Sequence, residues 1–133
     1  AWLQQAVDQT EAWGVTPEQL CLDPGIGFGK TLEQNYQLIH RTAETKLPGY
    51  AYLLGASRKR CIGAPAGNPP FDRRDSGTVA AHTIGVLGGA DILRSHDGFG
   101  AVQAARVADA VRLEGRQGPE RLQGLEGRQE RDD

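Results

Sequence analysis

The chain has 133 residues, a length that suits one domain or part of one. Hydrophobic residues make up 38% and charged residues 24%, which is somewhat polar for a globular chain but not typical of overall disorder. The net charge of -2 gives no support to nucleic-acid binding, and the lack of a run of about 18 apolar residues excludes a membrane span.

Two further features concern the cell compartment and the completeness of the chain. Cys21 lies in an apolar strand and Cys61 in an unrelated context, so we expect reduced thiols, with Cys21 buried. No secretory pattern is found, and we expect a cytoplasmic protein. The chain begins at Ala1 and contains no methionine, which indicates a piece of something longer.

Strands and helices alternate along the first half of the sequence. Apolar spacing predicts a helix over residues 1–13, and Gly14 is the expected C-cap. The apolar run Leu20 to Leu22 predicts a strand, which leads into a glycine-rich turn. A capping box of Thr31 and Gln34 predicts the start of a helix over residues 32–45. The stripe expected to be buried on this helix comprises Leu32, Tyr36, Ile39 and Ala43.

The second half repeats the alternation twice more. The predicted elements are a strand at 50–55, an irregular and mobile segment at 63–72, a helix at 76–87, a strand at 90–93 and a helix at 99–113. Alternating strands and helices predict a parallel α/β sheet. Units of about 35 residues suit a (β/α)-barrel, although a doubly wound sheet has a similar pattern. Residues 1–113 are the expected domain, and residues 114–133 the expected charged, disordered tail.

The glycine turn matches neither of two familiar phosphate-binding loops. A P-loop needs a glycine where Pro24 stands, although Gly29-Lys30-Thr31 supplies its end. The dinucleotide fingerprint starts at Gly25 and Gly27, but its third glycine is replaced by Lys30. Nucleotide hydrolysis and a dinucleotide cofactor are therefore disfavoured.

Charged and polar side chains follow each predicted strand, and parallel strands bring their carboxyl ends to one edge of the sheet. These residues are Asp23, Ser57, Lys59, Arg94 and His96. A carboxylate acceptor, a hydroxyl and cationic donors suit a planar polar ligand that carries anions. Each residue also has a plainer interpretation. Asp23 could organise the turn, residues 57–60 could form a solvated basic loop, and His96 could join Asp97 in capping the last helix.

Three segments together resemble the dihydropteroate synthase family over about residues 1–111. They are Asp-Pro-Gly-Ile-Gly-Phe-Gly-Lys at 23–30, Gly-Ala-Ser-Arg-Lys at 55–59 and Arg-Ser-His-Asp at 94–97. The resemblance implies that the pterin is bound by Asp23, Phe28, Lys59 and Arg94. It implies that p-aminobenzoate is bordered by Gly27, Phe28, Ser57 and Lys59. It also implies that Arg94 and His96 hold the pyrophosphate and that the catalytic residues are Lys59, Arg94 and His96.

The same resemblance implies a (β/α)8 TIM barrel of which this chain is a C-terminal fragment, covering about the last three βα units. The implied enzyme joins p-aminobenzoate to 6-hydroxymethyl-7,8-dihydropterin pyrophosphate in folate synthesis, and it is a sulfonamide target. Mg²⁺ is the implied cofactor, with no metal ligand in this chain because the family's asparagine ligand belongs to an earlier strand. A homodimer through the C-terminal helices is also implied.

The chain by itself is expected to be inactive or barely active, since the earlier strands carry further ligands. Two rival interpretations remain: a pterin-dependent methyltransferase domain of the same superfamily, and an inactive half-barrel that binds pterin weakly or assembles with a partner.

Overall fold

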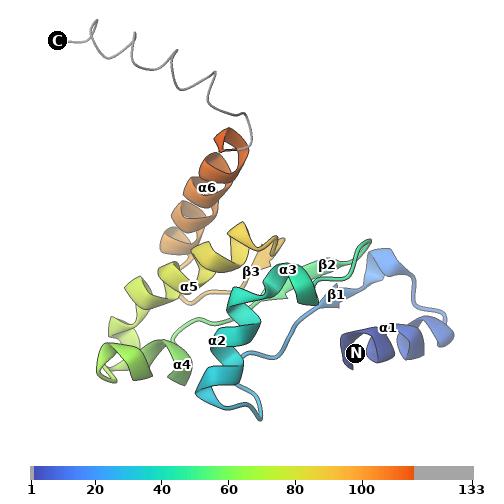
Figure 1. Ribbon diagram of the computed structural model, residues 1–133, viewed down its shortest axis with the longest axis horizontal. Helices are drawn as coiled ribbons and strands as arrows, with labels where there is room; N and C mark the ends of the chain where they lie inside the picture. Colours follow the sequence, from blue (N-terminus) through green and yellow to red (C-terminus); the bar gives the residue numbers. More distant parts are fainter. Residues whose placement is uncertain (1, 116–133) are drawn as a thin grey trace, which may run out of the picture.

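The computed structural model describes residues 2–115, which form three parallel strands and the helices around them (Figure 1). The strands are β1 (Cys21–Leu22), β2 (Ala51–Leu54) and β3 (Ile92–Leu93). The helices are α1 (Trp2–Ala12), α2 (Leu32–His40), α3 (Thr42–Thr45), α4 (Arg60–Gly63), α5 (Asp75–Leu87) and α6 (Gly98–Glu114). Short 3-10 turns are η1 (Pro17–Gln19), η2 (Ala64–Ala66) and η3 (Phe71–Arg73). The tail predicted from residue 114 lies, from residue 116 on, outside the described residues.

The sheet has the strand order β1-β2-β3, so neighbours in the chain are also neighbours in the sheet. Both pairs are parallel, with Cys21 opposite Ala51 and Leu53 opposite Ile92. The predicted α/β class with a parallel sheet is therefore confirmed, and the carboxyl ends of all three strands lie at one edge. No helix within residues 2–115 is both long enough and apolar enough to cross a membrane.

One face of the sheet is covered by helices and forms the core. Leu22, Tyr52 and Leu54 point to this face because they alternate with the residues on the other face, and all three are buried. Ile39 of α2 and Ala81 of α5 belong to the same buried cluster. Figure 1 shows α1 beside β1 at one end of the molecule and α6 reaching away from the other end.

The opposite face of the sheet is much more open. It carries Cys21, Ala51, Leu53 and Ile92, of which Cys21 and Ile92 are exposed. The expectation of a buried Cys21 is therefore wrong. The cause is the alternation of the strand: Leu22 takes the covered face, so its neighbour Cys21 takes the open one.

The start of α2 follows the predicted capping box. Gln34 N donates to the Thr31 hydroxyl at 3.2 Å, and Thr31 N donates to the Gln34 side-chain oxygen at 2.9 Å. The helix does not continue to residue 45, because Arg41 leaves the helical conformation with φ −99° and ψ 29° and separates α2 from α3.

The buried stripe of this region also differs from the prediction. Tyr36 and Ala43 are exposed, whereas Asn35, Ile39 and Thr42 face the core. Thr42 satisfies its hydroxyl locally by donating to the Ile39 carbonyl at 2.9 Å. Positions 35 and 42 therefore replace the predicted positions 36 and 43 in the buried stripe, because the polar side chains there have local hydrogen-bond partners.

The segment at 63–72 contains more regular structure than predicted. It begins inside α4, continues through η2 and enters η3. Asn68 N donates to the Gly63 carbonyl at 2.8 Å, and the Arg74 guanidinium donates to the Pro69 carbonyl at 2.8 Å. These bonds hold the segment against the start of α5.

The two C-terminal helices pack closely because small residues lie between them. Gly100, Ala104 and Ala108 form the buried side of α6, spaced four residues apart so that they share one face. Val107 and Val111 of the same helix are exposed. The contact of α6 with α5 therefore depends on close backbone approach rather than on large side chains.

His82 on α5 is buried, and neither ring nitrogen has a hydrogen-bond partner among the described residues. Burial lowers the pKa of His82, because the imidazolium cannot be solvated there. The unfolded chain, with the usual pKa, then binds more protons in mild acid than the folded chain does.

We expect the free energy of unfolding to fall as the pH is lowered through and below the usual pKa of histidine, about 6.5, by up to roughly 1.4 kcal/mol per pH unit from this group. His82→Leu should remove that part of the slope. Urea unfolding at several pH values measures it, and His40→Leu, which changes an exposed histidine on α2, is the control. An unchanged slope in His82→Leu would contradict the prediction.

Candidate functional site

The side chains predicted at the strand ends meet at the carboxyl edge of the sheet. A cavity of about 270 Å³ lies there between the turns that follow β2 and β3. Its lining consists of Gly55, Ser57, Lys59, Arg94, Ser95 and His96. Four of the five predicted strand-end residues thus border one cavity. Asp23 does not border it, but its carboxylate acts electrostatically on Lys59, as described below.

Ser57 and His96 are connected across two strands. The backbone N–H of His96 donates to Ser57 Oγ at 3.0 Å, and the same hydroxyl lies 2.8 Å from His96 Nδ1. The hydroxyl proton can therefore donate to Nδ1, which leaves Nε2 as the N–H donor of a neutral ring. Asp97 occupies the N-cap position of α6, as the capping interpretation expects, but its side chain makes no capping bond, and the His96 ring lies against Ser57.

Arg94 lies against the bare backbone at the end of β2. A Cβ atom at Gly55 would be only 3.3 Å from both Nε and Nη2 of Arg94. Among the described residues, the Arg94 guanidinium has no hydrogen-bond or ion-pair partner. An arginine held flat at a cavity wall with its donors free is suited to an anion or to the face of a planar ring.

Lys59 connects this cavity with the glycine turn after β1. Its Nζ donates to the Ile26 carbonyl and lies 4.6 Å from the centre of the Phe28 ring. Burial lowers the pKa of Lys59, while the nearby Asp23 carboxylate raises it and Arg94 lowers it. Asp23 is therefore close enough to act on Lys59 electrostatically.

The glycine turn is closed by its own charged residues. Asp23 Oδ1 accepts from Gly25 N at 2.8 Å, so the turn-organising interpretation of Asp23 is correct for one of its two oxygens. Lys30 Nζ donates to the carbonyls of Gly25 at 2.8 Å and Phe28 at 3.0 Å. Phe28 itself is exposed, so its ring is available to a ligand beside Lys59.

The turn that carries Lys59 is fixed to α5. Arg58 adopts the left-handed conformation, with φ 57°, which is uncommon outside glycine. Its guanidinium forms two parallel bonds to Asp75, at 2.8 and 2.9 Å, and its backbone N donates to Thr78 at 3.0 Å. Arg58 also lowers the pKa of Asp75 through these bonds. The interpretation of residues 57–60 as a solvated basic loop is therefore wrong.

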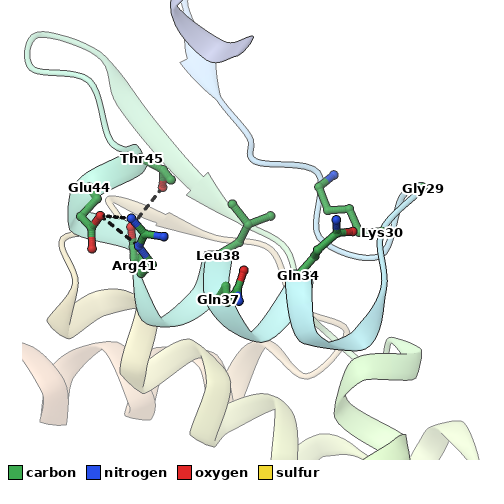
Figure 2. Close-up of a pocket in the computed structure, with 8 residues that line it drawn as sticks. All are labelled: Gly29, Lys30, Gln34, Gln37, Leu38, Arg41, Glu44 and Thr45. Atoms are coloured by element: carbon green, nitrogen blue, oxygen red, sulfur yellow. Dashed lines mark hydrogen bonds and ion pairs between the residues drawn. The ribbon is translucent and has the colours of Figure 1, made fainter. Parts of the chain in front are cut away.

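A second cavity, of about 530 Å³, lies away from the strand ends along α2 and α3 (Figure 2). Figure 2 shows Arg41 and Glu44 pointing toward one another at one end, while Lys30 lies near the other. None of the strand-end residues borders it. The larger volume therefore does not make it the better candidate, since the groups suited to an anionic ligand gather elsewhere.

Several residues that build the site were not among the predicted ones. Gly55 admits Arg94, Asp75 holds Arg58, and Asn35 on α2 binds the glycine turn. The sequence holds one sign that Asn35 is buried. It lies one helical turn before Ile39 and therefore shares the face of α2 that packs against the core. The described residues contain no cluster of three or more His, Cys, Asp or Glu side chains.

The fold and the site define an α/β protein with cationic strand ends beside a glycine turn, arranged for a small planar ligand that carries anions. Residues 1–96 match the model of a protein family described as pterin binding enzyme. The chain belongs to this family.

Similar proteins carry a more specific name. Dihydropteroate synthase of Synechocystis sp. is 46% identical over 105 residues, which are 79% of this chain and 36% of that protein. The crystal structure of Yersinia pestis dihydropteroate synthase superposes with a TM-score of 0.77 at 38% identity, covering 82% of this chain and 51% of that one. The enzyme from Xanthomonas albilineans, in complex with 7,8-dihydropteroate, gives 0.79 at 36% identity, covering 89% and 45%. The chain thus spans about half or less of the length of these relatives.

Proposed function

We propose that this chain is the part of a dihydropteroate synthase that binds the pterin pyrophosphate and borders p-aminobenzoate. The observation that carries the proposal is the meeting of Ser57, Lys59, Arg94 and His96 at one cavity beside Asp23. The Xanthomonas relative was solved in complex with 7,8-dihydropteroate, the product of joining p-aminobenzoate to the pterin. This supports the same ligand class here.

In the proposed reaction the bond from the methylene carbon of the pterin to the pyrophosphate oxygen breaks. The arylamine nitrogen of p-aminobenzoate forms the new bond to that carbon and loses a proton. Negative charge grows on the leaving pyrophosphate, so we assign its stabilisation to the free donors of Arg94 and to Nε2 of His96. The amine is neutral and needs no strong base, and positioning is expected to supply most of the rate.

The remaining assignments are those that the family resemblance implies. Asp23 has one carboxylate oxygen beyond its bond to Gly25 N and would accept from the amino-pyrimidine edge of the pterin. Lys59 would bond the pterin ring, and Arg94 would stack on it. Phe28, Gly27, Ser57 and Lys59 would border p-aminobenzoate. We assign no Mg²⁺ ligand to the described residues, which contain no group of three or more His, Cys, Asp or Glu side chains.

The architecture of the whole enzyme is part of the same proposal. We assign the chain to the last three βα units of a (β/α)8 barrel, acting in the cytoplasm. The open sheet face with Cys21 and Ile92 then corresponds to the interior of the barrel. Dimerisation would use α6, where Val102, Val107 and Val111 are exposed.

Calorimetric titration of the purified 133-residue chain tests the proposal. We expect binding of 6-hydroxymethyl-7,8-dihydropterin pyrophosphate, followed by p-aminobenzoate, and turnover at least about 10³-fold below that of a full-length relative, because groups outside this chain complete the site. Binding of a folate alone would favour the methyltransferase, and binding of neither substrate would favour the inactive half-barrel. Turnover equal to that of the relative would contradict the assignment of this chain as an incomplete site.

A further inference from the structure

We propose that Asn35 is a positioning residue, which holds the glycine turn so that Phe28 and Lys59 present one surface to p-aminobenzoate. The inference rests on the proposed function. Asn35 lies in the first turn of α2 and is 3% exposed. Its Oδ1 accepts from Gly27 N at 2.6 Å, and its Nδ2 donates to the Thr31 carbonyl at 2.7 Å. One buried amide therefore ties the tip of the turn to the start of the helix.

The position of Gly27 matters because Lys59 passes directly over it. Gly27 has φ 81°, and a Cβ atom there would lie 2.9 Å from Cδ of Lys59. The ammonium group of Lys59 then reaches the carbonyl of Ile26, next to Gly27, and the ring of Phe28 on its other side. A movement of the Gly27 backbone would therefore displace the support of Lys59 and the ring of Phe28 together.

The opposite side of the turn has its own restraint. Lys30 holds the carbonyls of Gly25 and Phe28, whereas Asn35 holds the N–H of Gly27 between them. The N–H and the carbonyls point to different partners, so Lys30 cannot replace Asn35. Loss of the Asn35 amide would leave Gly27 N without its acceptor.

The pterin side of the site depends on Asn35 only through Lys59. Asp23 is oriented by its own bond to Gly25 N, two residues away, and Arg94 lies against Gly55. Neither of these two contacts passes through Gly27. The inference therefore predicts a larger loss for p-aminobenzoate, which is bordered by both Phe28 and Lys59, than for the pterin, which keeps Asp23 and Arg94.

A purely structural role for Asn35 would be to stabilise the start of α2. Gln34 provides the matched comparison, because its side chain accepts from Thr31 N at 2.9 Å in the same helical turn and, among the described residues, makes no hydrogen bond to the glycine turn. Q34A therefore weakens the start of the helix and leaves Gly27 held. N35D is the conservative variant: it keeps an acceptor for Gly27 N, but it replaces the donor to Thr31 with a carboxylate oxygen and adds a negative charge at a buried position.

The test compares the full chain with its N35L, N35D and Q34A variants by calorimetry and by NMR contacts between the Lys59 methylenes and the Phe28 ring. N35L should lose those contacts and bind p-aminobenzoate about 10-fold or more weakly in the presence of the pterin, with a smaller loss of pterin affinity. Q34A should stay within about 3-fold for both ligands, and N35D should lose less p-aminobenzoate affinity than N35L because it keeps the acceptor for Gly27 N. N35A replaces N35L if the leucine variant does not fold.

Equal losses for both ligands, retained Lys59–Phe28 contacts in N35L, or a Q34A variant that behaves like N35L would overturn the inference. If the unmodified chain binds neither ligand, the proposed function fails for this chain. The NMR contacts, measured without ligand, still decide whether Asn35 positions the turn.

Discussion

Replacing Arg94 with alanine is expected to weaken the binding of the pterin pyrophosphate to this chain by about 100-fold, or roughly 2.7 kcal/mol. The guanidinium lines the cavity at the strand ends and, among the described residues, its donors have no partner. Its hydrogen bonds to an anion would be charge-assisted, and such bonds contribute about 1.5–3 kcal/mol each. Calorimetric titration of the variant measures the loss directly.

The geometry of Arg94 allows two graded comparisons. Arg94→Lys keeps the charge but loses the planar fork, so an intermediate loss is expected. Gly55→Ala adds a methyl group 3.3 Å from the guanidinium and should displace it without changing the charge. Arg73→Ala, at an exposed arginine in η3, is the control for net charge. Equal affinities of Arg94→Ala and Arg73→Ala for the pterin pyrophosphate would exclude the assigned role of Arg94.

The parts of the structure that depend on local chemistry were predictable from the sequence. Thr31 and Gln34 form the predicted capping box, because both partners lie within three residues of each other. The meeting of Ser57 with His96 also followed from general physics, since parallel strands bring their carboxyl ends to one edge. The sequence pattern does not decide the strand order β1-β2-β3, because a barrel and a doubly wound sheet share the same alternation of strands and helices.

The remaining features depend on contacts between residues far apart in the chain. Asn35 is buried because Gly27, eight residues earlier, needs an acceptor, and no helical periodicity shows this. Arg58 sits in a left-handed conformation because Asp75 and Thr78 of α5 hold it. Cys21 is exposed because the helices cover the other face of the sheet. The apolar run Leu20 to Leu22 does not show which of its residues faces the helices.

Asp23→Asn is expected to lower the affinity for the pterin by about 10- to 100-fold and to leave the fold intact. The amide oxygen of asparagine can still accept from Gly25 N, so the turn keeps its bond. The free energy of unfolding should therefore change by less than about 0.5 kcal/mol. The substitution removes the negatively charged oxygen that would accept from the amino-pyrimidine edge of the pterin. This oxygen is the one that does not bond to Gly25 N.

A second consequence of the same substitution appears at Lys59. The Asp23 carboxylate raises the pKa of Lys59 against the lowering effect of burial, so its removal should lower that pKa further. Lys59 in Asp23→Asn should thus release its proton at lower pH than in the unmodified chain, as followed by NMR titration of its side-chain carbons. Asp72→Asn, which neutralises an exposed acid in η3, should leave both the pterin affinity and this titration unchanged. If the pterin affinity falls but the Lys59 titration does not move, Asp23 acts on the ligand alone. If neither the affinity nor the titration changes, Asp23 is not part of the site.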